Sequence, residues 1–306
     1  MIVAVIVGVI TGAIASGASV LYATLGEIIG QRAGIVNLGI EGVMLVGASV
    51  GFATTAATGD ALVGVLAGTL AAAAFNCILG LLAVTRRANP LASGLALWLL
   101  GAGASTLIGL DYTGSHIRGL PDIELPFVAS LPPLYQQIFR QDPLVYLMVP
   151  VAIGLWWLLR RTRWGLHLRA VGEDRTAAYA AGLRTSFIQY QALFIAGALS
   201  GLAGVQLALA YTKTWQEGMT AYRGFVVLAI VIFSLWHPMR AIAGALLFGG
   251  AISLGLQLQV LGTPVSPFVL NMLPYLITFA VVLVWGRPKA FTVPMGLREV
   301  FEGTAK

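Results

Sequence analysis

Long apolar runs separated by short polar stretches dominate the chain. A hydrocarbon core of about 30 Å requires about 20 apolar residues in helical form. Nine stretches approach or reach that length, near residues 2–25, 35–57, 61–84, 91–109, 143–159, 189–211, 224–236, 241–260 and 268–285. The apolar and polar residues in them do not alternate as they do in a membrane-barrel strand. The pattern therefore predicts an all-α, polytopic transmembrane helical bundle of about eight to ten spans.

Two of these stretches carry signs of a broken or re-entrant helix. Residues 224–236 would reach only about 20 Å as a helix, and Pro238, which follows them, stops or kinks a helix. At the beginning of the second stretch, Gly34, Gly39 and Gly42 weaken the helix around the polar residues Asn37 and Glu41.

The basic residues separate by side and predict the orientation. One side carries Arg32, Arg86, Arg87, Arg160, Arg161, Arg163, Arg169, Arg175, Arg184, Arg240, Arg287, Lys289, Arg298 and Lys306, and the other carries Arg118, Arg140, Lys213 and Arg223. Because basic residues resist translocation, the first side is predicted to be cytoplasmic, with the N-terminus outside and the C-terminus inside. No Lys or Arg precedes the first apolar stretch, so we expect a retained span rather than a cleaved signal peptide.

The whole chain, residues 1–306, is expected to form a single transmembrane domain in a bacterial inner membrane. It would carry an outer loop at 110–142, a cytoplasmic loop at 160–188 and a cytoplasmic tail at 286–306. The outer loop is expected to be either a short ordered cap or a plain connector.

Composition excludes several classes of protein. Of the residues, 58% are hydrophobic and 10% are charged, against roughly 25% charged in soluble domains, which excludes a cytosolic enzyme. The single cysteine, Cys77, excludes an intrachain disulfide and a cysteine-based metal cluster. His116, His167 and His237 are far apart, so no metal site is expected. No hydrolase, metalloprotease or phosphate-loop motif occurs, so we expect no catalytic residue and no cofactor bound by this chain.

The cytoplasmic loop predicts a helix of two to three turns. Glu173 and Asp174 suit the positive end of a helix. The alanines after them, including Ala177 and Ala178, are strong helix formers, and Gly182 suits the C-terminal stop. A helix this short is unstable alone in water and must dock against something.

We interpret that helix as a docking element for another protein. Small side chains would let a partner approach closely, and the charged residues would set the register. The expected coupling residues are Glu173, Asp174, Arg175, Ala177, Ala178 and Gly182. The alternative is a helix lying on the lipid surface, but such helices place Lys or Arg opposite large apolar residues.

Glu41 is the only ionisable residue that this pattern places inside a span, and such residues are functional by default. With Asn37 it stands at i and i+4, which predicts one shared helix face. Asn37, Glu41 and Asn76 of the third span are therefore candidates for a permeation path or its gate. The alternative is that Glu41 satisfies neighbouring backbone or pairs with Arg32, and that Asn76 forms an interhelical hydrogen bond.

Three motifs resemble a known family. The segment 172–204, with its acidic, Ala-Ala and Gly pattern, resembles the coupling-helix region of ABC importer permeases for ribose, branched-chain amino acids and nucleosides. The string Arg-x-Gly-x-x-Asn-x-Gly-x-Glu-Gly at 32–42 is similar to the nucleoside-type signature that opens the second span. Residues 88–97 resemble the next conserved stretch of that subgroup, with Pro90 where a glutamine is expected.

The resemblance implies the permease subunit of an ATP-driven importer that works by alternating access. ATP and Mg would be held on separate ATPase subunits, a second permease subunit would complete a heterodimer, and an external solute-binding protein would deliver the substrate. A nucleoside or purine-like compound is the implied substrate, with a simple sugar as the alternative. An ion-coupled secondary transporter has weaker support, because that class usually shows several intramembrane carboxylates.

Overall fold

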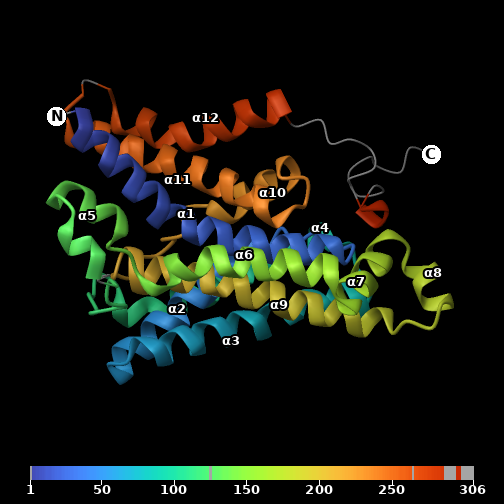
Figure 1. Cartoon of the computed structure of the whole chain (residues 1–306). Helices are drawn as coiled ribbons and strands as arrows, with labels where there is room; N and C mark the ends of the chain where they lie inside the picture. Colours follow the sequence, from blue (N-terminus) through green and yellow to red (C-terminus); the bar gives the residue numbers. More distant parts are fainter. Residues whose placement is uncertain (1, 124–125, 264, 286–293, 298–306) are drawn as a thin grey trace.

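The protein is a bundle of helices whose long axes run mostly in one direction (Figure 1). The computed structural model describes residues 2–123, 126–263, 265–285 and 294–297. The α-helices are α1 (Ile2–Arg32), α2 (Ile40–Thr58), α3 (Ala61–Leu79), α4 (Pro90–Gly109), α5 (Pro133–Phe139), α6 (Pro143–Arg161), α7 (Arg163–Glu173), α8 (Arg175–Ala180), α9 (Thr185–Gln206), α10 (Arg223–Phe233), α11 (Pro238–Val260) and α12 (Pro267–Trp285). Helix α3 continues as a π-helical turn over Gly80–Thr85, and α9 as another over Leu207–Tyr211.

The predicted all-α transmembrane bundle is confirmed. Each of the nine predicted stretches contains an apolar helix, and in the part of the chain that the structure describes seven are long and apolar enough to cross a membrane. The other two, Arg223–Phe233 and Pro267–Val281, are shorter. The first helix extends beyond the predicted end at residue 25 and reaches Arg32.

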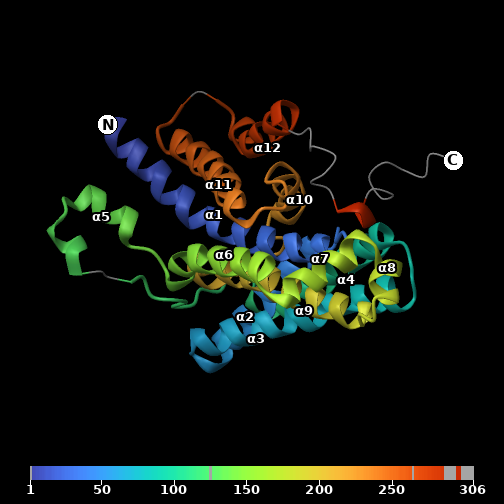
Figure 2. The same cartoon turned by 45° about the vertical axis from the view of Figure 1, so that its right-hand side comes forward.

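The loops at 110–142 and 160–188 lie at opposite ends of the bundle, as the figures show for α5 on one side and α7 and α8 on the other (Figures 1 and 2). Within the first loop, the backbone N–H groups of Ile117 and Leu120 donate to the carbonyls of Lys213 and Leu209, at 3.1 and 2.8 Å. Isolated bridges pair His116 with Thr214 and Ile123 with Gln141. The described part of this loop is therefore an ordered cap rather than a plain connector.

Helices α2 and α9 form the centre of the bundle, since 72% of the residues in the most apolar part of each are buried. Glycine permits their close crossing. A Cβ atom added to Gly47 would lie 2.6 Å from the carbonyl oxygen of Gly201, closer than any side chain tolerates. Long helix α1 packs along α9 and α11 and joins the central pair to the rest of the bundle.

Candidate functional site

The chain breaks between α1 and α2, where the glycines predicted a broken helix. Residues 33–39 are irregular and mostly buried, and Gly34 has a φ of +83°. Asn37 lies in this segment and Glu41 is the second residue of α2, so the expectation that they share one helix face is wrong.

The break brings Asn37 and Asn76 together. The amide of Asn37 donates to Oδ1 of Asn76 at 2.8 Å, and the amide of Asn76 donates to the carbonyl of Leu193 on α9 at 2.7 Å. Oδ1 of Asn37 accepts from the backbone N–H of Gly39 at 2.7 Å. Both side chains are buried, so this pair ties the irregular segment to α3 and α9 through hydrogen bonds between helices.

Sequence reasoning missed Glu27, a second carboxylate inside a span. Its Oε1 accepts from the amide of Gln31 at 2.8 Å and from the backbone N–H of Asn37 at 3.0 Å. Oε1 of Gln31 accepts from the indole N–H of Trp236 at 2.6 Å. Glu27 is 2% exposed. A continuous buried network therefore runs from the end of α10, through α1 and the break, to α3 and α9.

Glu41 binds the beginning of α10, not its own helix. Its Oε1 accepts from the Thr220 hydroxyl at 2.6 Å and from the backbone N–H of Tyr222 at 2.7 Å. Its Oε2 accepts from the backbone N–H of Gly224 at 2.7 Å. A carboxylate at the N-terminus of a helix meets both free N–H groups and the positive end of the dipole. The alternative pairing with Arg32 is wrong, because Arg32 donates to the carbonyl of Trp236 at 3.4 Å.

The chain entering α10 has a rare backbone conformation. Ala221 and Tyr222 have φ values of 48° and 59°, in the left-handed region that non-glycine residues seldom adopt. The hydroxyl of Tyr275 on α12 donates to the carbonyl of Ala221 at 2.8 Å. Together with Glu41, this bond holds the turn from both sides, and such strain concentrates at functional sites.

Arg223 was predicted in an outer loop and is instead the first residue of α10, 8% exposed. Its Nη1 donates to Oγ of Ser19 at 3.1 Å, and its guanidinium carbon lies 5.7 Å from the ring centroid of Tyr211. The prediction that Arg223 lies in an outer loop was wrong because part of that loop is buried, and a basic residue in the buried part is not in water.

The predicted coupling helix is split in two. Glu173 ends α7, and its carboxylate accepts from the backbone N–H of Met295 at 3.0 Å. Asp174 alone caps α8, and its Oδ1 accepts from the N–H groups of Thr176 and Ala177 at 2.8 and 2.9 Å. Helix α8 is thus six residues long and not two to three full turns, and the expected start at Glu173 is wrong.

One face of α8 is free and the other is not. Ala177 and Gly182 are exposed, but Ala178 is 5% exposed and packs into the protein, so it cannot contact a partner. A cleft of about 500 Å³ lies beside the free face, lined by Arg87, Arg175, Thr176, Tyr179, Thr185 and Ser186. Arg175 donates to the Ser186 hydroxyl at 3.1 Å, and burial together with the charge of Arg87 lowers the pKa of Arg175. The two guanidinium groups give this cleft a positive charge.

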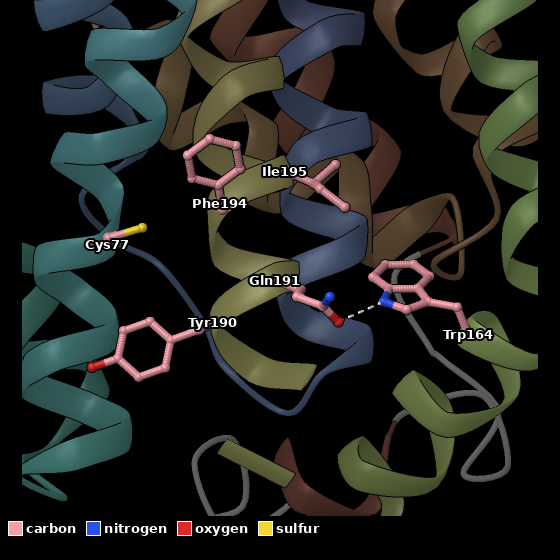
Figure 3. A pocket seen from close by; sticks show the side chains of 6 residues that line it. All are labelled: Cys77, Trp164, Tyr190, Gln191, Phe194 and Ile195. Atoms are coloured by element: carbon pink, nitrogen blue, oxygen red, sulfur yellow. Dashed lines mark hydrogen bonds between the residues drawn. The ribbon is translucent and has the colours of Figure 1, made fainter. Parts of the chain in front are cut away.

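A second pocket, of about 430 Å³, lies between α3, α7 and α9 (Figure 3). Tyr190 reaches from α9 toward the helix that carries Cys77 (Figure 3). The indole of Trp164 donates to Oε1 of Gln191 at 3.1 Å, which joins α7 to α9. The lining is mostly apolar, and Cys77 is only partly buried in it. This pocket does not suit a polar solute. Among the described residues, no group of three His, Cys, Asp or Glu side chains gathers at any site.

The bundle thus combines a buried polar network, a helix that begins on a carboxylate and an exposed short helix at one end. The family described as "Branched-chain amino acid transport system / permease component" matches residues 8–284. The chain belongs to this permease family. It is the membrane-spanning permease subunit of an ABC importer, which confirms the resemblance seen in the sequence.

Three relatives match this permease along nearly its whole length. The putative glucose ABC transporter permease protein TsgC13 of Haloferax volcanii is 35% identical over 296 residues, which cover 90% of each chain. The nucleoside ABC transporter permease protein NupC of Lactococcus lactis is 32% identical, over 85% of this chain and 86% of its own. The guanosine ABC transporter permease protein NupQ of Bacillus subtilis is 31% identical, over 90% and 92%.

Proposed function

We propose that this permease moves a nucleoside or purine-like compound across the membrane. Two relatives with names of nucleoside and guanosine permeases support the proposal, at 32% and 31% identity. The nucleoside-type signature at 32–42 also supports it, since it supplies the break and Glu41. The observation that carries the mechanism is the Glu41 carboxylate on the N-terminus of α10, because helices that begin within the bundle form the solute sites of many transporters.

A simple sugar is the alternative substrate, favoured by the 35% identity to a putative glucose permease. A ligand screen on the cognate binding protein separates the two. We expect binding of guanosine or adenosine and none of glucose. Binding of glucose alone would refute the nucleoside proposal.

Energy would come from separate ATPase subunits that hold ATP and Mg and dock on α8. The exposed Ala177 and Gly182, the capping residue Asp174 and the positively charged cleft at Arg175 support this interface. Closure of the ATPases would move α8 and α7, and the bundle would change between inward-open and outward-open packings.

An Ala177→Arg substitution tests the docking. We expect this variant to lose co-purification with the ATPase while its own melting temperature stays unchanged, because Ala177 is exposed. Ala57→Arg, at an exposed alanine near the other end of the bundle, is the matched control. Equal co-purification of both variants would refute the docking site.

The second permease subunit, as a heterodimer partner, and an external solute-binding protein complete the proposed complex. The inner membrane is the proposed location, with the N-terminus outside. The clustering of Arg160, Arg161 and Arg163 near α7 and α8 supports that orientation, because this end would face the cytoplasm. Asn37 and Asn76 would hold the gate closed through their mutual hydrogen bond, and Glu41 would position α10.

A further inference from the structure

The segment before α10 lies deep in the bundle yet is exposed. Trp98 is the ninth of the twenty residues of α4, so it marks the middle of that helix. Its ring centroid lies 5.3 Å from that of Phe225, in the first turn of α10. Helix α10 therefore begins near the level of the membrane centre. Residues 216–222 lead down to this level as a series of turns, and Glu217, Ala221 and Tyr222 are exposed along it.

Lipid cannot cover such a segment. Irregular backbone at membrane depth occurs only where protein buries it or where it lines a water-filled cavity. Glu217 marks the end of this segment that is farther from the membrane centre, because it lies beside Thr106 in the last turn of α4. Its Oε1 accepts from the hydroxyl of Thr106 at 3.0 Å, which fixes the segment along α4. The surface formed by α4, residues 216–222 and the first turn of α10 therefore borders either a water-filled path or the partner permease, and labelling from water distinguishes the two.

Three aromatic rings from two elements gather on this surface. Besides the edge-on pair of Trp98 and Phe225, the rings of Tyr222 and Phe225 lie 6.4 Å apart at an interplanar angle of 34°. Tyr222 is 61% exposed. An exposed aromatic ring is a stacking surface for a planar heterocycle, worth about 1–3 kcal/mol per base, or about 5- to 150-fold in affinity.

The fold fixes this exposed tyrosine. Glu41 accepts from the backbone N–H of Tyr222 and holds it in a left-handed conformation. A Cβ atom on Gly42, the next residue, would lie 2.8 Å from Cα of Trp98, so the same turn of α2 also positions the tryptophan.

We propose that Trp98, Tyr222 and Phe225 form a stacking surface in the permeation path, which receives the planar base of the transported compound. This inference rests on the proposed nucleoside function and assigns its contact residues. Glu41 is a positioning residue that acts through Tyr222, not a substrate ligand.

Water access to Tyr222 is tested first, independently of transport. Cys77→Ala removes the single cysteine, and Tyr222→Cys is introduced in that background in the complete complex with its ATPase, partner permease and binding protein, in vesicles. Phe279→Cys, on α12 and 63% exposed, is the control for an equally exposed aromatic position outside this surface. A membrane-impermeant methanethiosulfonate reagent, applied to both sides with and without ATP, should label position 222, and guanosine should slow that labelling. Labelling no greater than at position 279 in every state would overturn the proposal.

Transport kinetics test the stacking. In the complete complex, Tyr222→Ala should raise the apparent KM for guanosine by about 5- to 150-fold, whereas Tyr222→Phe, which keeps the ring, should stay within about twofold of the wild type. Phe279→Ala should leave the KM unchanged. A wild-type complex that takes up glucose and no nucleoside refutes the proposed function. A wild-type complex that takes up guanosine, with an unchanged KM in Tyr222→Ala, refutes the stacking surface alone.

Discussion

Replacing Glu41 tests whether a buried carboxylate holds the beginning of α10. The side chain accepts three hydrogen bonds, from Thr220, Tyr222 and Gly224, at 2.6, 2.7 and 2.7 Å. Two of the donors, the Thr220 hydroxyl and the Gly224 N–H, are buried. Leaving a buried donor without its acceptor costs about 1–3 kcal/mol, so Glu41→Ala should cost about 2–6 kcal/mol. A typical protein is stable by only about 5–15 kcal/mol.

The stability of the Glu41→Gln variant should lie between that of the wild type and that of Glu41→Ala. Glutamine supplies one carbonyl oxygen, but its NH₂ group meets a donor where the second carboxylate oxygen accepted. We expect a loss of about 1.5–3 kcal/mol, the value of one hydrogen bond to a charged group. Uptake should fall in the same order as stability, because the α10 turn must be formed for transport.

The assay is thermal unfolding in lipid nanodiscs, combined with a double-mutant cycle. Thr220→Val removes one of the three donors and should destabilise the wild type, but it should add little in the Glu41→Ala background. Thr58→Val is the control, because the Thr58 hydroxyl is exposed and bonds only to nearby backbone. A Glu41→Ala protein with wild-type melting and uptake would refute the assigned role of the carboxylate.

Three further substitutions probe other parts of the bundle. Asn76→Leu removes the hydrogen bonds to Asn37 and to the Leu193 carbonyl. At about 0.6–1.7 kcal/mol per interhelical bond, the free energy of unfolding should fall by about 1–3 kcal/mol. An unchanged melting curve would contradict this prediction. Gly47→Val should abolish folding in a detergent-stability assay, because the valine side chain would meet the Gly201 backbone. Gly103→Val is the control and should fold normally, because an added Cβ there meets nothing within 4 Å. Equal yields of the two variants would show that the crossing of α2 and α9 is not tight. Burial and the charges of Arg160, Arg240 and Arg32 lower the pKa of His237, whose Nδ1 accepts from the Met239 N–H. The neutral ring therefore stabilises the fold fully above the unfolded pKa of about 6.5, and this contribution is lost as the pH falls below it. Between pH 8 and 5 the melting temperature of the wild type should fall more steeply than that of His237→Asn. Parallel curves would refute the linkage.

The helical bundle could be predicted from the long apolar stretches, because the hydrocarbon core of the membrane imposes a length and a composition on each span. The short helix before His237-Pro238 was also predictable: α10 has 11 residues, or about 16 Å. Local rules of this kind act within one segment and can be recognised without knowing its neighbours.

Features that depend on contacts between distant segments were not predictable. The predicted first span ended at residue 25 and left Glu27 outside it, yet Gln31 and Asn37 donate to this carboxylate inside the bundle, and Trp236 in turn donates to Gln31. The three partners of Glu41 lie 179 to 183 residues further along the chain. The buried side of α8 at Ala178 likewise depends on packing, not on the composition of a six-residue helix.

The anchoring of α10 has a consequence for biogenesis. An apolar helix of only 11 residues, which begins with an arginine, is too short to insert on its own as it leaves the ribosome. Its acceptor on α2 has already been synthesised by then, so the first half of the chain acts as a template onto which the later segment folds. Defects in the early helices should therefore appear as misinsertion of residues 212–233, far from the altered position.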